Sequence, residues 1–525
     1  MHTIAEFVNV FRDAGILSEA PEGAILDTPV QLISHDSNEV VPGTLFFVKG
    51  IHFKEQYLLD SIGKGAVCYV AEEVHQDVPE GTPYMIVNDM RKALALAANL
   101  YYDRVWTKLK TAGITGTKGK STTTYYVKYI LDEAMAEQGK PEPALLSTIE
   151  NYDGVERVES RRTTPETFEL HRHMDTAVKS GIDHMVMEVS SQALKYHRTY
   201  DIVFDVGAML NVEEDHISAI EHPDVADYVN SKMMLFGQVK TAVINKACRY
   251  FERAVREADE SPVVEKIVIF GIDEDGSRPD LLGDIKVSKP VVQLLGYDLS
   301  PTRKNITFRA EEEGAFDDSF TINMPGLFNV ENALAAIAIC HELGIGIPEI
   351  QKGLFKAHVD GRMEVFSDPE ERCLVIVDYA HNKMSMQALF DAVRRDYADR
   401  KIVICYGCPG KKALGRRKEL SDIPGKYADH IIITEEDPGE EDLMKICNEI
   451  AEHVAATGNK NYEIIPDRRE AIEKAVNVYG DNAVVLLTAK GRESRMKRGV
   501  GYEDAPTDVE MACEVLGIED PLAAK

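Results

Sequence analysis

The chain has 525 residues, of which 44% are hydrophobic, and this length suggests about three domains. No apolar run approaches the ~20 residues that span a bilayer, and the N-terminus lacks the basic and apolar segments of a signal peptide, so we expect a cytoplasmic protein without membrane insertion. The formal net charge of −29 speaks against a nucleic-acid partner, because such proteins present a basic face to the phosphates.

Near the N-terminus, two apolar runs predict buried strands at residues 43–50 and 66–71, with a short helix at 58–64 between them. This alternation is typical of a small α/β domain. We place the domain at residues 1–107, which end beside Trp106, the only tryptophan.

A glycine-rich turn at residues 113–124 predicts a phosphate-binding loop. Its glycines let backbone N–H groups surround phosphates, Lys120 supplies a positive charge, and the Ser121 hydroxyl can ligate Mg²⁺. The spacing is not that of a strict Walker A motif, because Ile114 stands where the first glycine belongs. The context supports the motif: residues 110–115 can form a strand, and apolar residues recur at helical spacing behind Ser121. The sequence therefore predicts a nucleoside triphosphate site.

Further apolar runs behind this loop alternate with helical patterns and predict a parallel sheet. They lie at residues 184–189, 202–210 and 241–245. Residues 305–310 and 319–323 flank an acidic turn that contains glycine, and they predict a hairpin. A helix at 330–343 closes this central region, which we place at residues 108–358.

The last region repeats a unit of apolar strand, polar turn and helix. The apolar runs lie at residues 374–378, 401–405, 430–434 and 483–487. The pattern predicts a second doubly wound sheet, which we place at residues 359–525, and such sheets bind ligands beyond the carboxyl ends of their strands. The expected fold is therefore α/β with three domains, in which a central P-loop parallel sheet is flanked by an N-terminal α/β domain and a C-terminal Rossmann-like domain.

Polar residues after the central strands are candidates for chemistry. Glu188 ends an apolar strand, where a phosphate-binding domain needs an Mg²⁺ ligand, and a surface glutamate seldom ends so apolar a run. His216 follows the next strand and could ligate a metal, although a lone histidine is usually structural. Thr163 and Thr164 precede Pro165 at a plausible helix start. A threonine could cap that helix, or its free N–H groups could hold an anionic substrate.

Taken in order, the motifs resemble the Mur ligase family. They are Gly-Thr-Lys-Gly-Lys-Ser (116–121), Thr-Thr-Pro-Glu (163–166), Glu-Val-Ser-Ser (188–191), Asn-x-x-x-Asp-His (211–216), Gly-x-Phe-Asn-x-x-Asn (326–332), Gly-Arg-Met-Glu (361–364) and Asp-Tyr-Ala-His (378–381). Within the family the chain is most similar to the tripeptide synthetases of the MurE type, because residues 35–38 and 41–47 resemble their UDP-binding segment and residues 490–493 also match.

The resemblance implies a UDP-binding domain at residues 1–107, an ATP-binding domain at 108–358 and an amino-acid-binding domain at 359–525. It implies a monomeric ATP-dependent carboxylate–amine ligase of peptidoglycan precursor synthesis, with ATP and Mg²⁺ as cofactors. The D-glutamate carboxylate of UDP-MurNAc-L-Ala-D-Glu would attack the γ-phosphate of ATP. The amine of a free diamino acid would then attack the acyl phosphate.

Matching positions assign roles to residues of this chain. The catalytic set is Lys120, Glu188, His216 and Lys232. The metal ligands are Ser121, Glu188, His216 and Lys232, the last in carbamylated form. The nucleotide contacts are Gly116, Thr117, Lys118, Gly119, Lys120, Ser121, Thr122, Asn332, Arg362, Asp378 and His381. The contacts to the UDP-sugar-peptide are Ser37, Thr163, Thr164, Ser190 and Arg198.

The chain also departs from the family pattern. Lys118 stands where Mur ligases usually carry asparagine, and this form of the loop is more typical of folylpolyglutamate synthetases. Those enzymes share the fold and the acyl-phosphate chemistry but lack a long domain before the loop, so they give the second interpretation. A third interpretation is a catalytically idle nucleotide-binding protein. The intact Lys120, Glu188, His216 and Lys232 argue against it.

The segment around Asp437 bears on the amino acid. Diaminopimelate enzymes carry Asp-Asn-Pro-Arg there, but Gly439 replaces the arginine and cannot bind a distal carboxylate in bidentate fashion. Glu436, Asp437 and Glu493 instead offer negative charge to a side-chain ammonium. We therefore expect L-lysine, with ornithine or meso-diaminopimelate as alternatives. The acidic loop could equally be a solvated surface, with specificity set elsewhere.

Overall fold

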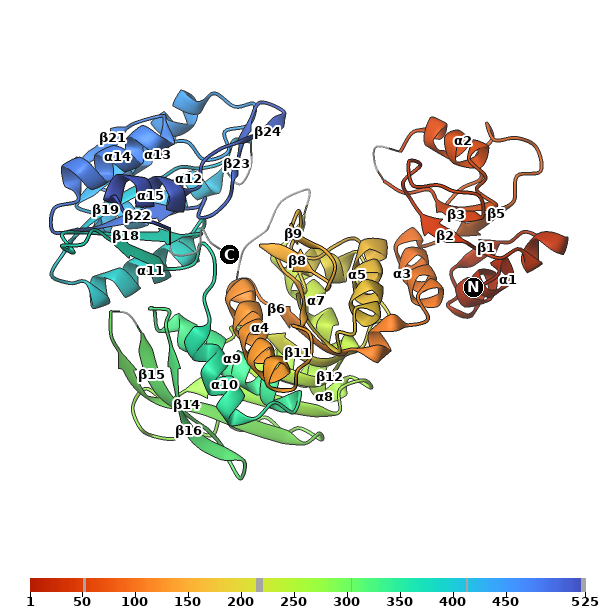
Figure 1. Cartoon of the computed structure of the whole chain (residues 1–525), viewed down its shortest axis with the longest axis horizontal. Coiled ribbons are helices and arrows are strands. Elements are labelled where there is room, and N and C mark those ends of the chain that lie inside the picture. Colours follow the sequence, from red (N-terminus) through yellow and green to blue (C-terminus); the bar gives the residue numbers. More distant parts are fainter. Residues whose placement is uncertain (51–52, 214–220, 304, 412–413, 521–525) are drawn as a thin grey trace.

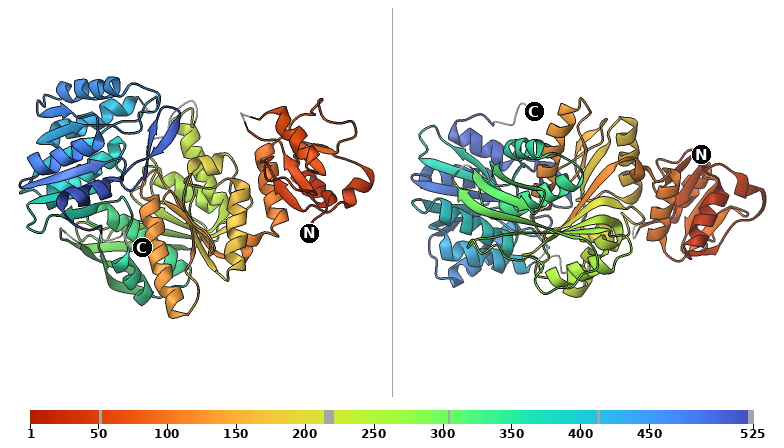
Figure 2. Two further views of the ribbon diagram at one scale, coloured as in Figure 1. Left: turned by 45° about the horizontal axis from the view of Figure 1, so that its top comes forward. Right: turned by 90° about the horizontal axis from the view of Figure 1, so that it is seen from below.

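The computed structural model describes residues 1–50, 53–213, 221–303, 305–411 and 414–520. Three α/β sheets follow one another along the chain, and the first and third lie at opposite ends of the molecule with the large central sheet between them (Figure 1, Figure 2). The predicted α/β class and the central, largely parallel sheet are therefore confirmed. None of the helices formed by the described residues is both long enough and apolar enough to cross a bilayer.

The first region forms a five-stranded sheet with helices on both faces. Its elements are α1 (Ile4–Asp13), β1 (Leu17–Glu19), the 3-10 helix η1 (Gly23–Asp27), β2 (Leu32–Ser34), β3 (Thr44–Phe47), α2 (Glu55–Gly63), β4 (Cys68–Ala71), β5 (Tyr84–Val87), α3 (Met90–Tyr101) and the 3-10 helix η2 (Val105–Lys108). The strand order is β1-β5-β4-β3-β2. Side chains alternate along β3, so Leu45 and Phe47 share a core with α1 and α3, whereas Phe46 packs toward α2.

The central region forms one eleven-stranded sheet and the helices that cover it. Its elements are β6 (Lys110–Thr115), α4 (Lys120–Glu137), β7 (Ala144–Leu146), β8 (Glu150–Tyr152), β9 (Arg157–Glu159), α5 (Thr167–Lys179), β10 (His184–Glu188), α6 (Ser191–Lys195), β11 (Phe204–Met209), α7 (Val225–Met233), the 3-10 helix η3 (Met234–Gln238), β12 (Val239–Asn245), α8 (Phe251–Glu260), β13 (Lys266–Ile272), β14 (Val291–Pro301), β15 (Ile306–Glu312), β16 (Phe316–Ile322), α9 (Phe328–Glu342) and α10 (Ile347–Lys356). The order is β16-β15-β14-β13-β12-β11-β6-β10-β7-β8-β9, with the seven strands from β14 to β7 parallel and antiparallel hairpins at both edges.

Strand β6 lies in the middle of the parallel part and coincides with the strand predicted at residues 110–115. Helix α4 follows it and is buried along most of its length, because it packs against α9 and α10 as well as the sheet. Helix α10 approaches so closely that a Cβ on Gly353 would lie 2.3 Å from the Cα of Ile130. This packing fixes the helix whose first residue is Lys120.

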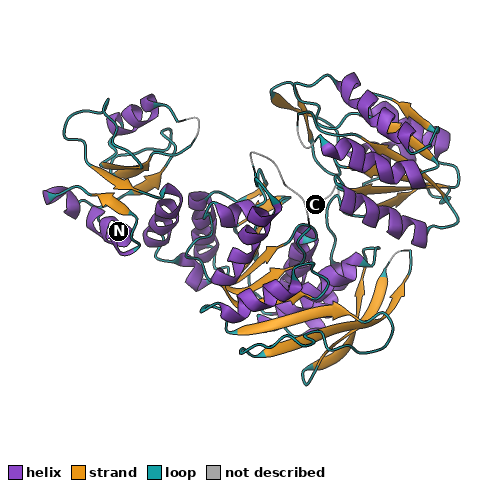
Figure 3. Cartoon of the chain, turned by 180° about the vertical axis from the view of Figure 1, so that it is seen from behind, coloured by secondary structure: helices purple, strands orange, loops and turns teal. Residues whose placement is uncertain are grey.

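The third region forms a six-stranded sheet with helices on both faces (Figure 3) and a separate two-stranded ribbon. Its elements are β17 (Glu364–Ser367), β18 (Cys373–Asp378), α11 (Lys383–Asp396), β19 (Lys401–Tyr406), α12 (Gly415–Tyr427), β20 (His430–Ile433), α13 (Leu443–Ala456), β21 (Tyr462–Ile464), α14 (Arg468–Tyr479), β22 (Ala483–Thr488), β23 (Arg495–Arg498), β24 (Gly501–Asp504) and α15 (Asp508–Leu516). The sheet order is β17-β18-β22-β19-β20-β21. Ile376 and Ile404 face α11 to α13, and Val375 and Val403 face α14 and α15.

Ion pairs join the three regions. Lys49 of the first region binds Glu166 of the central one at 2.5 Å. The β23–β24 ribbon reaches from the third region to β9, where Arg495 binds Glu159 at 2.8 Å. Both of these ion pairs lie on the segment from β9 to α5. Further ion pairs join the regions elsewhere: Arg104 binds Asp201 at 2.8 Å, and Arg303, between β14 and β15, binds Asp399 of the third region at 2.6 Å.

Candidate active site

Loops that follow three parallel strands meet at the carboxyl edge of the central sheet. Strand β6 pairs with β10 on one side and with β11 on the other, so the glycine-rich loop lies between the residues that follow those strands. Asn211, which follows β11, binds the loop directly. Its Oδ1 accepts the Lys118 backbone N–H at 2.8 Å, and its Nδ2 donates to the Lys118 carbonyl at 3.1 Å. The pairing of β6 thus brings the predicted phosphate and metal residues into one place.

The glycine-rich loop turns through Gly119, whose φ of +82° is in the left-handed region. A Cβ at this position would lie 2.3 Å from Oδ1 of Asn332, so the predicted nucleotide contact from α9 lies against the loop. Lys120 begins α4, and its Nζ donates to the Gly116 carbonyl at 2.9 Å. The loop, the backbone N–H groups at the start of α4 and this ammonium are the groups that an anion site of this kind requires.

Lys232 approaches the same loop from helix α7. It is 1% exposed, and its Nζ donates to the Gly116 carbonyl at 2.8 Å. The ammonium also lies 4.8 Å from the ring centre of Tyr228, whose hydroxyl is 2.9 Å from the Thr117 hydroxyl. Helix α7 is thus attached to the loop at two points. Tyr228 was not predicted, because an aromatic residue on an amphipathic helix looks like an ordinary core residue.

Glu188 is completely buried at the end of β10. Its carboxylate accepts hydrogen bonds from the backbone N–H of Thr148 at 2.8 Å and from the Thr148 hydroxyl at 3.1 Å. The Thr148 hydroxyl also lies 3.3 Å from that of Thr163. A buried carboxylate oriented by fixed donors suits a metal ligand better than a solvated surface group. The other predicted ligand, His216, lies outside the described residues.

Three of the residues predicted for the sugar-peptide form one group. The Thr164 hydroxyl lies 3.4 Å from that of Ser190, and Arg198 donates to the Thr164 carbonyl at 3.1 Å. Glu166 binds Arg198 at 2.9 Å and Lys49 at 2.5 Å. Burial raises the pKa of Glu166, but the positive charges of Lys49 and Arg198 outweigh it and lower the pKa to about 2. The carboxylate is therefore ionised at neutral pH and holds two cations beside Thr164.

Ser37, the predicted contact in the first region, is buried, and its carbonyl accepts a hydrogen bond from Lys64 at 2.7 Å. It is held within its own sheet by this bond. The first region meets the central one through Lys49 and through the ring contact of Phe47 with Phe168, whose centroids are 5.2 Å apart.

The third region contributes Asp378 at the end of β18. Burial raises the pKa of this carboxyl, and the positive charge of Arg362 and the backbone N–H of Met363, 2.9 Å from Asp378 Oδ2, partly offset the rise, with a smaller effect from the charge of Lys118. Lys118 belongs to the glycine-rich loop, so its charge acts on a carboxylate of the neighbouring sheet. The Arg362 guanidinium lies 4.4 Å from the ring centre of Tyr379, and His381 Nδ1 lies 2.7 Å from the Tyr379 carbonyl. Arg362, Asp378 and His381, the predicted nucleotide contacts of the third region, thus lie on the side of the loop that carries Lys118.

The three acids predicted to contact an ammonium have different surroundings. Lys490 binds Asp437 at 3.0 Å and Glu493 at 2.7 Å, so both carboxylates are already paired with a cation of the chain itself. Glu436 is buried, and one of its carboxylate oxygens has no hydrogen-bond partner among the described residues. Burial raises the pKa of Glu436 to about 8. Lys490 was not predicted, although its place in the 490–493 motif is the signal that could have found it.

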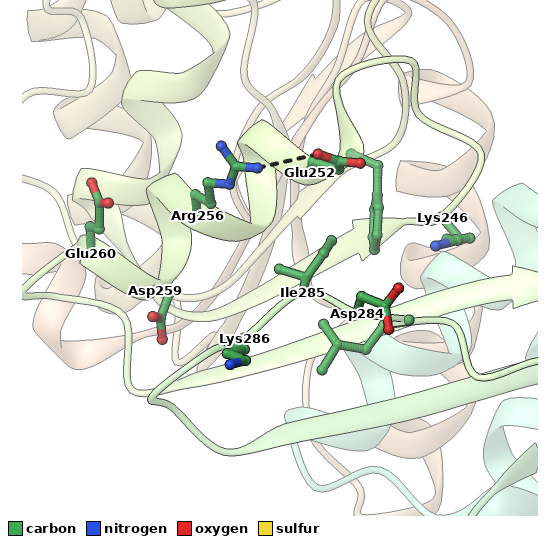
Figure 4. A pocket seen from close by; sticks show the side chains of 11 residues that line it. Lys246, Glu252, Arg256, Asp259, Glu260, Asp284, Ile285 and Lys286 are labelled. Atoms are coloured by element: carbon green, nitrogen blue, oxygen red, sulfur yellow. Dashed lines mark hydrogen bonds and ion pairs between the residues drawn. The ribbon is translucent and has the colours of Figure 1, made fainter.

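A separate groove of about 590 Å³ lies between α8 and the segment of residues 282–286 (Figure 4). Charged side chains line much of it, among them Lys246, Arg256 and Lys286, and Arg256 is paired with Glu252 at 3.3 Å. None of the predicted site residues that lie within the described part of the chain lines this groove. The groove is therefore distinct from the site at the edge of the central sheet.

Two family models match the chain. The Mur ligase middle domain matches residues 114–340, and the Mur ligase, glutamate ligase domain matches residues 361–491. The UDP-N-acetylmuramoyl-L-alanyl-D-glutamate–L-lysine ligase of Enterococcus faecalis is 37% identical over 480 residues, covering 91% of this chain and 89% of the relative. The UDP-N-acetylmuramyl-tripeptide synthetase of Lactobacillus acidophilus is 34% identical over 514 residues, covering 97% of this chain and 96% of the relative.

Solved structures share the fold at lower sequence identity. A UDP-N-acetylmuramoyl-L-alanyl-D-glutamate–2,6-diaminopimelate ligase superposes with a TM-score of 0.64 at 21% identity, over 95% of this chain and 97% of that one. MurF from Acinetobacter baumannii superposes with a TM-score of 0.61 at 16% identity, over 98% of each chain. The three-sheet arrangement is therefore that of known ligases.

A Lys118→Ala variant tests the contact between the loop and the third region. Loss of this positive charge should raise the pKa of Asp378, so its carboxylate is protonated at a higher pH as the solution is acidified. We expect the acid limb of the pH profile of ATP-dependent turnover to move to higher pH. Lys286→Ala, in the separate groove, is the matched control and should leave the limb in place. An unchanged limb in Lys118→Ala would contradict the coupling.

Proposed function

Because the chain belongs to the Mur ligase family, we propose that it joins L-lysine to the D-glutamate carboxylate of UDP-MurNAc-L-Ala-D-Glu, with conversion of ATP to ADP and phosphate. Relatives that match nearly the whole chain are named as lysine ligases or tripeptide synthetases of this pathway. The single structural observation that supports the proposal most is the meeting of the glycine-rich loop, Glu188 and Lys232 with the Thr164 group at one edge of one sheet.

The proposed reaction explains why phosphate and substrate residues adjoin. A carboxylate is a poor electrophile, so its oxygen first forms a bond to the γ-phosphorus while the bond to ADP breaks. The amine of lysine then bonds to the carbonyl carbon, and phosphate leaves with the oxygen that attacked. Both partners of the first step are anions, and the cations Lys120, Arg198 and Lys49 lie where they screen that repulsion.

The residues present fit the Mg²⁺ that the family implies. Glu188 is a buried, oriented carboxylate, and Ser121 supplies a hydroxyl in the first turn of α4. We propose that these two residues hold Mg²⁺ together with His216 and a carbamylated Lys232. A carbamate keeps one N–H, so the bond from Lys232 to Gly116 can persist while the added carboxylate offers oxygen ligands. Bound Mg²⁺ would supply positive charge to the transferring phosphoryl group.

For the amino acid, Glu436 supports lysine. Its carboxylate is buried without full hydrogen bonding, and this arrangement becomes favourable when a cation is added. Lys490 is already paired with Asp437 and Glu493. We propose that Glu436 receives the side-chain ammonium of lysine, which stabilises its ionised form, whereas the distal carboxylate of diaminopimelate would gain no such pairing there.

We also propose the domain boundaries 1–107, 108–358 and 359–525, with the UDP moiety bound by the first domain, the nucleotide by the second and the amino acid by the third. We further propose that the protein is a cytoplasmic monomer. Asn332, Arg362, Asp378 and His381 would contact the nucleotide, and Ser37 would contact the UDP moiety.

A substrate panel tests the proposed function. ATP, Mg²⁺ and UDP-MurNAc-L-Ala-D-Glu are incubated with lysine, ornithine, meso-diaminopimelate or a neutral amino acid, and the products are weighed by mass spectrometry. We expect the product to be heavier by one lysyl residue and little product with diaminopimelate. Faster turnover of diaminopimelate than of lysine would contradict the specificity, and absence of ADP with every combination would contradict the ligase.

The pH dependence of lysine binding tests Glu436. With a pKa of about 8, its ionised fraction rises from about a tenth at pH 7 to about nine tenths at pH 9, while the lysine side chain stays mostly charged. The KM for lysine should therefore fall, by up to about tenfold, as the pH rises over this range. In Glu436→Gln the KM should be higher and this part of the pH dependence should vanish. Equal profiles in the two proteins would refute the role.

A further inference from the structure

A chain of hydrogen bonds, buried at Ser191 and His222, links these two residues to Asp227 beside the proposed site. The Ser191 hydroxyl lies 2.9 Å from His222 Nε2, and His222 Nδ1 lies 2.6 Å from an oxygen of Asp227. Ser191 is 7% exposed and the His222 side chain is completely buried. None of these residues belongs to the nucleotide, metal or substrate sets assigned above.

The charges determine which atoms donate and which accept in this series of hydrogen bonds. The hydrogen bond from Lys195 is the largest effect on Asp227 and lowers its pKa, and the bond from His222 lowers it further. The carboxylate is therefore ionised at neutral pH and can only accept, so His222 Nδ1 donates to it. In the neutral ring, Nε2 then accepts the proton of the Ser191 hydroxyl. Every polar atom of the imidazole is used by these two bonds.

These hydrogen bonds connect two parts of the site that lie on separate elements, the turn after Glu188 and the helix α7. Ser191 is the first residue of α6 and follows Glu188 by one short turn. Asp227 lies in the first turn of α7, the helix that carries Lys232. A second bond joins the same two helices, because Lys195 of α6 binds Asp227 at 2.6 Å.

His222 also contacts the residue through which α7 reaches the phosphate loop. Its ring packs edge-on against Tyr228, with centroids 5.1 Å apart. The Tyr228 hydroxyl is the group that meets Thr117 of the loop. A shift of His222 would therefore displace two parts of the site. It would act on the Glu188 turn through Ser191 and on the phosphate loop through Tyr228.

We propose that His222 is a positioning residue that holds α7 in register with the turn that carries Glu188, so that Lys232 and Glu188 face the phosphate loop together. It acts through Ser191 and Asp227 and touches neither substrate nor nucleotide. The same order of side chains occurs in serine hydrolases, but here the serine is buried in a contact between two helices. The inference rests on the proposed ligase activity, because the register matters only when both elements serve one reaction.

The experiment compares kinetics of His222→Ala, Ser191→Ala and the double variant, with steady-state KM and kcat for ATP and UDP-MurNAc-L-Ala-D-Glu. Residues that orient the ligands of a metal or phosphate site typically contribute about 10–100-fold. We expect kcat to fall by about that factor in His222→Ala while KM for ATP changes less than about threefold. The double variant should lose no more than His222→Ala alone, because the two residues act as one unit. His222→Gln, whose amide can donate and accept, should recover part of kcat.

His173→Ala is the matched control. His173 of α5 is likewise buried and forms a pair with Asp153 at 2.7 Å in the same region, without belonging to α6 or α7. It should lower the melting temperature as much as His222→Ala does but keep kcat within about twofold of wild type. If His222→Ala fails to fold, Ser191→Ala, which removes only a hydroxyl, tests the positioning role by the same changes in kcat and in KM for ATP.

Two outcomes separate the proposals. If the wild-type protein is active but kcat is unchanged in His222→Ala or Ser191→Ala, the positioning role alone is overturned. The same holds if His173→Ala loses as much kcat as His222→Ala. A wild-type chain that releases no ADP would overturn the ligase proposal and this inference with it.

Discussion

The parallel pairing of β6 with β10 and β11 is the constraint on which the site depends. It places the glycine-rich loop between Glu188 and Asn211, and Asn211 then fixes the loop through both backbone groups of Lys118. On the other side of the loop, the left-handed conformation of Gly119 and the close approach of Asn332 restrict the conformation of the backbone. Without this pairing, Lys120 and Lys232 could not share the carbonyl of Gly116.

The distribution of charge follows from the proposed chemistry. The chain is strongly acidic overall, yet cations gather where its anionic substrates would meet. Lys49 and Arg198 flank Glu166, and Lys118 and Arg362 act on Asp378. Each group lies where one region of the chain faces the next, so the charges that would bind substrate also draw the regions together. Substrate binding and the relative placement of the regions are therefore expected to be linked.

Much of the fold could be predicted because the signals are local. The strand at 110–115, the helix behind Ser121 and the hairpin formed by β15 and β16 each follow from short apolar patterns or turn residues. Two strands of the first region, β3 and β4, were also located, although they are shorter than the apolar runs that predicted them, whereas β1, β2 and β5 were not predicted. The ribbon β23–β24 was missed, because its strands are short, charged and largely exposed.

Contacts of the candidate site that join distant parts of the chain could not be predicted from the sequence. Lys490 compensates Asp437 from 53 positions away, and His222 reaches Ser191 across 31. Neither pairing leaves a local pattern, since a lysine or a histidine at such a position looks the same whether it is paired or solvated. Lys118, which departs from the usual family residue, acts on Asp378 of the third sheet, a residue 260 positions away that no local pattern connects to it.

The central claim is that the loop and its neighbours activate a carboxylate by phosphorylation, and oxygen transfer tests it most directly. UDP-MurNAc-L-Ala-D-Glu would carry ¹⁸O in the reacting carboxylate, and the phosphate released with lysine and ATP would be weighed. The account predicts one ¹⁸O atom in each phosphate formed, because the attacking oxygen leaves with it. Unlabelled phosphate accompanying the amide product would contradict the account.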